Sequence, residues 1–159
     1  MLFRSAGADG AFAPGGLSDR VMEITGGRGA DFAVETSGSG AALQSAVDAV
    51  ATEGTVVVAS WYGTKPVTLA LGGHFHRGRV RLRSSQVGRL NPALAPRWDR
   101  VRRMETVLGL LGRLKLRELI SHRIPFGEAP QAYAMLDDRP EEALQVIFTY
   151  EEIRGGQDV

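Results

Sequence analysis

Small polar residues and glycines gather between residues 25 and 40, where the sequence reads TGGRGADFAVETSGSG. Three glycines precede an apolar run, and a short polar group follows that run, namely Glu35, Thr36, Ser37 and Gly38. Parallel α/β sheets bind nucleotides beyond the carboxyl ends of their strands, where hydroxyls and glycine allow a close approach. This segment is therefore the first candidate for a nucleotide site.

The turn that runs from Gly38 to Leu43 partly matches the dinucleotide fingerprint G-x-G-x-x-G. It follows an expected strand and opens an expected helix, as the fingerprint requires. Leu43 stands where the third glycine should be and would hold the helix off the sheet, and no strand ends in an acid about 20 residues later, where the ribose ligand belongs. The turn is better interpreted as a secondary strand-end turn that touches the same cofactor.

Glu35 itself allows two interpretations. As a carboxylate at a strand end, it can cap a nearby backbone amide and have only a structural role. Alternatively, residues 35–38 together line a nucleotide crevice. The residues alone do not separate the two, and both stay open at this point.

The elements that must position these residues follow from hydrophobic periodicity. Residues 31–36 are predicted to be a buried parallel strand, residues 40–52 an amphipathic helix, and Thr55–Ala59 the next strand. Strand, helix and strand at this spacing indicate a right-handed parallel unit. A short apolar segment, Ala11–Ala13, is expected to be a strand end.

A Pro-containing connector at Asn91–Pro96 is the best internal boundary of the chain. Apolar residues from Trp98 to Leu111 recur at helical spacing and predict a long helix. A strand at His122–Pro125, a helix from Ala129 to Leu136 and a final strand at Leu144–Tyr150 are expected to follow.

Two further clusters of polar residues offer weaker chemistry. Residues 77–83 read RGRVRLR, so a strand there would place four arginines on one face; we favour an edge strand or a subunit interface, with phosphate binding second. His74 and His76 lack a third and fourth metal ligand nearby and are better interpreted as part of a solvated loop.

Composition and the absence of several motifs argue against some classes of function. The 159 residues carry a net charge of +1, and aromatic residues are not interleaved with the arginines, so nucleic-acid binding is not expected. No apolar run approaches the length that spans a bilayer, and the absence of cysteine fits a cytoplasmic protein. We find no Ser–His–Asp set, paired carboxylates or P-loop, and so predict no catalytic and no metal-ligating residue in this chain.

Four segments in order carry a resemblance to a known family: TGGRGADFAVETSGSGAAL, GTVVVASWYG, LRSSQVG and SHRIPFGEAPQAYAMLDDRPEEALQVIFTY. Together they resemble the C-terminal half of the medium-chain, zinc-type alcohol dehydrogenases and reductases. The resemblance implies an α/β fold: a partial Rossmann-like, doubly wound parallel sheet holding strands three to six of six. Residues 1–90 would form this half of the nucleotide domain. Residues 91–159 would pack on a GroES-like catalytic domain.

The resemblance also assigns cofactor-binding residues at three strand ends. Glu35, Thr36, Ser37 and Gly38 would follow the fourth strand. The fifth strand would be followed, on the nicotinamide side, by Ser60, Trp61 and Tyr62. Ser84, Ser85 and Gln86 would lie at the end of the sixth strand, near the carboxamide group of the nicotinamide. Ser60 departs from the family, which commonly has glycine there, and its side chain narrows the expected pocket.

The implied cofactor is NAD or NADP, and zinc is implied only for a full-length parent. The family's metal ligands, proton relay and G-x-G-x-x-G turn precede the segment that this chain matches, so we expect no hydride transfer by the chain alone. The expected partners are the nicotinamide dinucleotide and either a second copy or the missing N-terminal half. A non-catalytic module that associates through an exposed sheet edge, and a zinc-free quinone-reductase-like enzyme, remain alternatives.

Overall fold

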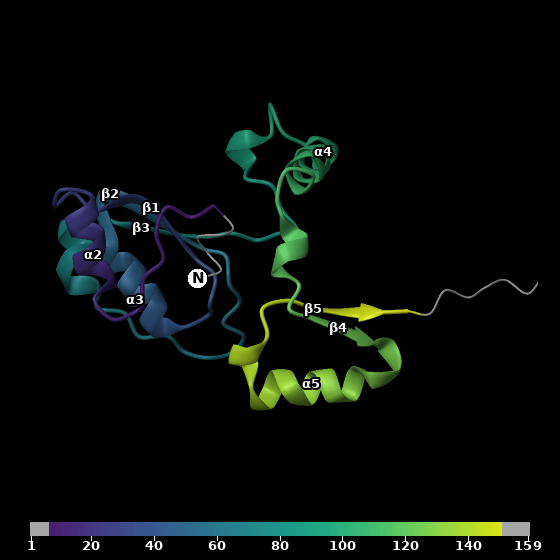
Figure 1. Cartoon of the computed structure of the whole chain (residues 1–159). Helices are drawn as coiled ribbons and strands as arrows, with labels where there is room; N and C mark the ends of the chain where they lie inside the picture. The colour runs from purple at the N-terminus through teal and green to yellow at the C-terminus, as the bar shows by residue number, and fades with distance from the viewer. Residues whose placement is uncertain (1–6, 151–159) are drawn as a thin grey trace, which may run out of the picture. The chain divides into compact units, whose positions relative to one another are not determined.

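The computed structural model describes residues 7–150, which divide into two compact units: residues 10–100, and residues 101–150 together with 7–9 (Figure 1). The first unit holds a three-stranded parallel sheet in the order β1-β2-β3, formed by Ala30–Glu35, Val50–Val58 and Arg81–Ser84. Two α-helices belong to it, α2 at Leu17–Ile24 and α3 at Gly40–Ala49. A π-turn at Leu71–Phe75 and a 3₁₀ turn at Pro92–Leu94 complete it.

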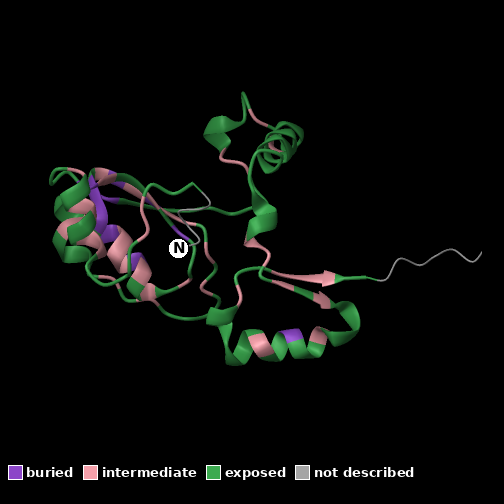
Figure 2. Cartoon of the chain, in the orientation of Figure 1, coloured by how far each residue is buried: buried purple, intermediate pink, exposed green. Residues whose placement is uncertain are grey.

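The core of this unit lies between α3 and the sheet, where Figure 2 shows most of the buried residues. Leu43 and Val47 come from α3, and they pack against Val50 and Val56 of β2. The Ser39 hydroxyl accepts a hydrogen bond from the Ala42 amide and caps α3, so the predicted helix begins directly after the strand-end turn. The predicted strand, helix and parallel strand are confirmed. The helix is shorter than predicted, because residues 50–52 belong to β2.

Register aligns the three strand ends. Glu35 lies opposite Val58, and Val58 lies opposite Ser84. Because the strands are parallel, the residues that follow each of them emerge at one edge of the sheet. The three groups of residues proposed for the cofactor begin at this edge.

Three other details of the sequence prediction are wrong. Ala11–Ala13 is not a strand, since it has no neighbouring strand with which to form a ladder. The arginine-rich segment enters β3 only at Arg81, because Arg79 has a left-handed backbone (φ 52°), so two of its four arginines lie on the strand. The run at 31–36 is only partly buried: Phe32 and Val34 are 57% and 51% exposed, because nothing in the described chain covers their face of β1.

The second unit holds α5 at Ala129–Asp138 and a parallel pair, β4 at His122–Pro125 and β5 at Val146–Thr149, all close to their predicted positions. An edge-to-face contact joins Phe126 and Phe148, whose ring centroids are 5.9 Å apart. Short 3₁₀ turns lie at Leu116–Leu119, Phe126–Glu128 and Pro140–Glu142.

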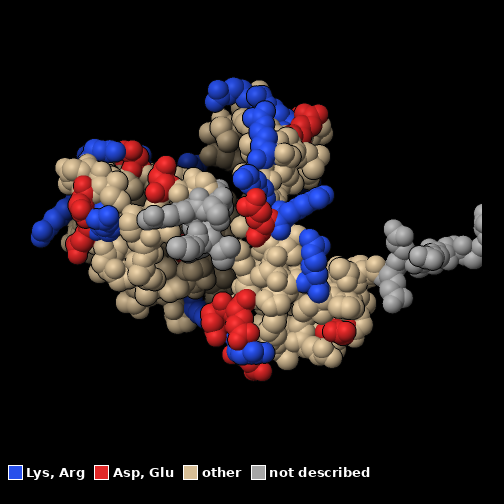
Figure 3. Space-filling model, in the orientation of Figure 1, with Lys and Arg blue, Asp and Glu red and all other residues tan. Residues whose placement is uncertain are grey.

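The predicted long helix is α4, Arg100–Leu111. Its apolar positions, among them Val101 and Leu108, are exposed. Basic side chains gather over the same part of the chain in Figure 3. The helix is therefore amphipathic, with its apolar side largely open to solvent. No helix of residues 7–150 is both long and apolar enough to cross a bilayer.

Candidate functional site

The Glu35 carboxylate lies at the centre of the strand-end edge. The residue is only 4% exposed, and it is the last residue of β1. Its Oε1 accepts hydrogen bonds from the Ser37 amide at 2.5 Å, the Ser37 hydroxyl at 2.6 Å and the Gly38 amide at 3.0 Å. One oxygen of Glu35 thus holds the whole turn between β1 and α3.

The second oxygen reaches the turn that follows β2. Glu35 Oε2 accepts hydrogen bonds from the Ser60 hydroxyl and, at 2.7 Å, from the Tyr62 hydroxyl. The Glu35 backbone carbonyl also accepts from the amides of Ala59 and Ser60, at 2.9 and 3.3 Å. Two of the three predicted groups of site residues are therefore held together by a single buried side chain.

These contacts set the charge of the site. Burial by itself raises the pKa of Glu35, but the hydrogen bonds from Ser37, Ser60 and Tyr62 outweigh it and lower the pKa to about 2. The pKa of the Tyr62 hydroxyl is raised, first by burial and then by its hydrogen bond to Glu35. At neutral pH, Glu35 is an anion whose acceptor positions are occupied by protein donors. The capping interpretation of Glu35 describes what its carboxylate does.

The neighbours of Glu35 remain accessible. Thr36 is exposed, and Trp61 is 90% exposed. Gly38 has a left-handed backbone (φ 70°), and a Cβ there would lie 3.4 Å from the Trp61 carbonyl oxygen. The first two turns are therefore closely packed, and they present hydroxyl groups and one large aromatic ring to solvent.

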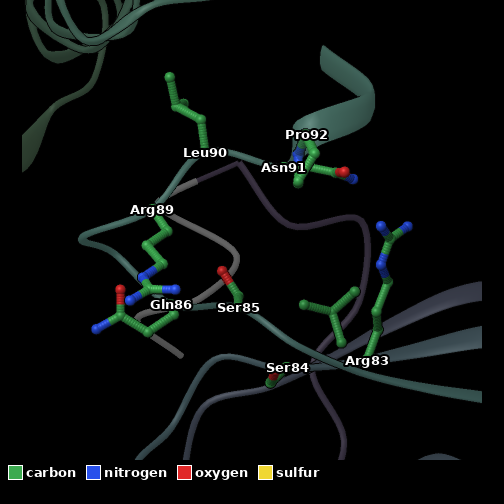
Figure 4. A pocket seen from close by; sticks show the side chains of 9 residues that line it. Arg83, Ser84, Ser85, Gln86, Arg89, Leu90, Asn91 and Pro92 are labelled. Atoms are coloured by element: carbon green, nitrogen blue, oxygen red, sulfur yellow. The ribbon is translucent and has the colours of Figure 1, made fainter. Parts of the chain in front are cut away.

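The third group, Ser84, Ser85 and Gln86, lies one strand further along the sheet. The Ser85 amide donates to the Val58 carbonyl at 2.8 Å, which extends the ladder past the end of β3. All three residues line a pocket of about 420 Å³, together with Val57, Arg83, Arg89, Leu90, Asn91 and Pro92 (Figure 4). Arg83 belongs to the arginine-rich segment 77–83, for which phosphate binding was the second interpretation. Asn91 was not predicted as a site residue, and its signal is a position soon after a strand end.

One of the two histidines, His74, has a different role from the one expected. The ring Nε2 of His74 lies 2.7 Å from the Val50 carbonyl oxygen, within the helical turn that precedes β3, so this residue ties the turn to β2 and is not in a solvated loop. Over residues 7–150, no group of three or more His, Cys, Asp or Glu side chains is placed to hold a metal ion.

Comparison with known proteins agrees with this architecture. Residues 2–104 match the family model described as zinc-binding dehydrogenase. The chain belongs to this family. It is also 33% identical over 156 residues to D-guloside 3-dehydrogenase from Escherichia coli (strain K12), and equally so to the protein of that name from Shigella flexneri. The match covers 92% of this chain and 43% of each relative, so the chain spans less than half the length of these curated proteins.

Solved structures show the same fold. An alcohol dehydrogenase from Thermotoga maritima superimposes with a TM-score of 0.66 at 25% identity, over 88% of this chain and 36% of that chain. An alcohol dehydrogenase from E. coli CFT073, solved as a complex with NADH, gives a TM-score of 0.64 at 18% identity, over 92% of this chain and 40% of that one. The predicted Rossmann-like α/β class and the resemblance to zinc-type dehydrogenases are confirmed.

Proposed function

We propose that this chain supplies one wall of a nicotinamide dinucleotide site in an NAD(P)-dependent dehydrogenase. In the whole protein, hydride would pass between the nicotinamide and a small alcohol or carbonyl compound. The observation that carries the proposal is the alignment of Glu35, Val58 and Ser84 across three parallel strands, since such edges are where nucleotides bind.

Each turn has a distinct part in this proposal. Thr36, Ser37 and Gly38 allow close approach of the cofactor backbone, while Ser60, Trp61 and Tyr62 flank the nicotinamide side. Ser84, Ser85 and Gln86 offer hydroxyl and amide groups that suit a carboxamide and ribose hydroxyls. Glu35 acts through its neighbours, because its hydrogen bonds hold the first two turns in place.

The direct test is calorimetric titration of the chain with NADH and, separately, NADPH. We expect saturable binding of at least one of them, with the preferred nucleotide identifying the cofactor. W61A and S85A should weaken this binding. T106A is the matched control, because the Thr106 hydroxyl donates to the Arg102 carbonyl within α4 and belongs to none of the three proposed groups. Absence of binding of either nucleotide to the folded chain would contradict the proposal.

The substrate has to be identified with a full-length protein that contains this chain. A glycoside hydroxyl is the first group to test, since the curated relatives are named D-guloside 3-dehydrogenases. The assay is reduction of NAD or NADP by a full-length protein that contains this chain. Turnover of simple aliphatic alcohols at higher kcat/KM than of glycosides would argue against a carbohydrate substrate.

A second candidate is a non-catalytic interaction module that pairs with a second copy of the chain. The observation in its favour is β1, which ends the sheet within residues 7–150 and exposes Phe32 and Val34. Size-exclusion chromatography coupled to light scattering, which measures the molar mass in solution, separates the two candidates. A concentration-dependent dimer without nucleotide binding would favour the module, and a monomer that binds NADH would exclude it.

A further inference from the structure

The pocket beyond β3 is lined by positively charged side chains and by no acidic ones. Its walls carry two arginines, two serines, one glutamine and one asparagine, with no aspartate or glutamate among the lining residues. Figure 4 shows Arg83 and Arg89 on opposite sides of the pocket with Ser85 between them. All of these residues belong to the same compact unit.

The two pocket arginines differ from others nearby in having no carboxylate to neutralise them. Arg79 and Arg81 both pair with Glu53, the latter at 2.8 Å. Arg83 is two residues further along β3, and Arg89 lies in the following turn. Within residues 7–150, neither of them forms an ion pair with an acidic side chain. The four arginines of residues 77–83 therefore fall into two groups. Glu53 neutralises Arg79 and Arg81, whereas Arg83 in the pocket and the exposed Arg77 have no acidic partner within residues 7–150.

The two amide side chains add hydrogen-bond donors. The Gln86 Oε1 accepts from the Gly88 amide at 2.5 Å, and the Asn91 Oδ1 accepts from the Ala93 amide at 3.0 Å. Both carbonyl oxygens are therefore engaged in local turns, which leaves the two NH₂ groups to face other partners. With the two serines and Gln86 assigned to the cofactor, the donors that remain for a second ligand are the two guanidinium groups and the NH₂ group of Asn91.

We infer that this pocket binds an oxyanion, a carboxylate or phosphate carried by the substrate. Planar guanidinium groups bind such oxyanions through paired, charge-assisted hydrogen bonds. The inference deepens the proposed function and rests on it: with the carboxamide at Ser84–Gln86, the part of the pocket lined by Arg83 and Arg89 lies beside the reacting end of the cofactor. The substrate class is then an alcohol or ketone that carries a carboxylate or phosphate, such as a sugar acid or sugar phosphate, which narrows the carbohydrate class proposed above.

The experiment titrates the chain with inorganic phosphate, with D-gluconate and with neutral D-sorbitol, and follows backbone amide NMR shifts at Ser84, Ser85 and Gln86. Phosphate and gluconate should shift these amides saturably, and sorbitol should not. R83Q and R89Q should each weaken binding about tenfold or more, since each loses hydrogen bonds to a charged group. R77Q removes the same charge outside the pocket and should leave the affinity unchanged.

Several outcomes would overturn the inference. Equal weakening in R77Q would show that only general charge attracts the anion, and a lack of shifts with both anions would show that no site exists. Displacement of phosphate by ADP-ribose would assign the pocket to the cofactor's own phosphates, against a substrate group. The proposed function fails separately: in that case the chain binds phosphate at these residues but does not bind NADH.

Discussion

Replacing Glu35 with glutamine tests whether a buried anion holds the strand-end turns together. The side chain keeps its shape, and its remaining oxygen can still face the amides of Ser37 and Gly38. Its new NH₂ group would have to donate to the hydroxyls of Ser60 and Tyr62, which now donate to the carboxylate. E35Q should therefore fold, with weaker and rearranged hydrogen bonds.

The magnitude follows from the pKa of Glu35. A folded pKa of about 2 against 4.5 in the unfolded chain corresponds to about 3 kcal/mol of stability above pH 4.5. Because the folded pKa is the lower of the two, this contribution is complete above pH 4.5 and is lost as the pH falls toward 2. About 2 kcal/mol of it should be gone by pH 3. E35Q should lose between about 1 and about 3 kcal/mol at pH 6.

The assay is urea unfolding of the wild-type chain and E35Q at pH 6 and pH 3, followed by circular dichroism. The difference in unfolding free energy between the two proteins should shrink at pH 3, because glutamine does not titrate. E53Q is the control: Glu53 forms exposed ion pairs with Arg79 and Arg81, and their loss should cost less than about 1 kcal/mol. An E35Q chain as stable as wild type at pH 6, or a difference that does not change with pH, would refute the reasoning.

Three further changes test the same unit. G29A should destabilise it by at least about 1 kcal/mol, because Gly29 has a φ of 85° and an added Cβ would lie 2.8 Å from the Ala51 nitrogen. G63A is the control in thermal melts: Gly63 is also left-handed, but an added Cβ would meet no atom, so the loss of stability should be smaller. Y62F should cost about 1 to 3 kcal/mol in urea unfolding. Its effect should not add to that of E35Q, since both substitutions change the same hydrogen bond between Tyr62 and Glu35; strict additivity would contradict this. F32T should reduce any self-association seen by light scattering without lowering the melting temperature, because the Phe32 side chain is exposed, whereas a marked loss of stability would show that this face is covered.

The hydrogen bonds of Glu35 bear on how the nucleotide wall is built. Ser60 and Tyr62 are 25 and 27 residues from Glu35 in the chain, yet their hydroxyls meet on one of its oxygens. A hydroxyl at position 60, where the resemblance leads one to expect glycine, therefore has a definite partner. The departure from the family pattern is explained by a structural contact.

Much of the architecture is determined by the sequence itself. The β-branched run in β2 and the helical spacing of Leu43 and Val47 predict a strand and a helix, because these patterns are local and depend only on which face is apolar. Glycine and hydroxyl residues directly after each strand likewise mark the binding edge. These features need no knowledge of distant residues.

Only the tertiary structure decided how individual side chains are used. The sequence left Glu35 between a backbone cap and part of a nucleotide crevice, and it did not reveal the donors that the turn after β2 contributes to the carboxylate. It also could not divide the arginines, because Glu53, which neutralises Arg79 and Arg81, is 26 and 28 residues away from them. The exposure of Phe32 depends on which layers cover the sheet. Hydrogen bonds, ion pairs and burial are made between distant residues, so they follow from the packing of elements and are absent from any local pattern.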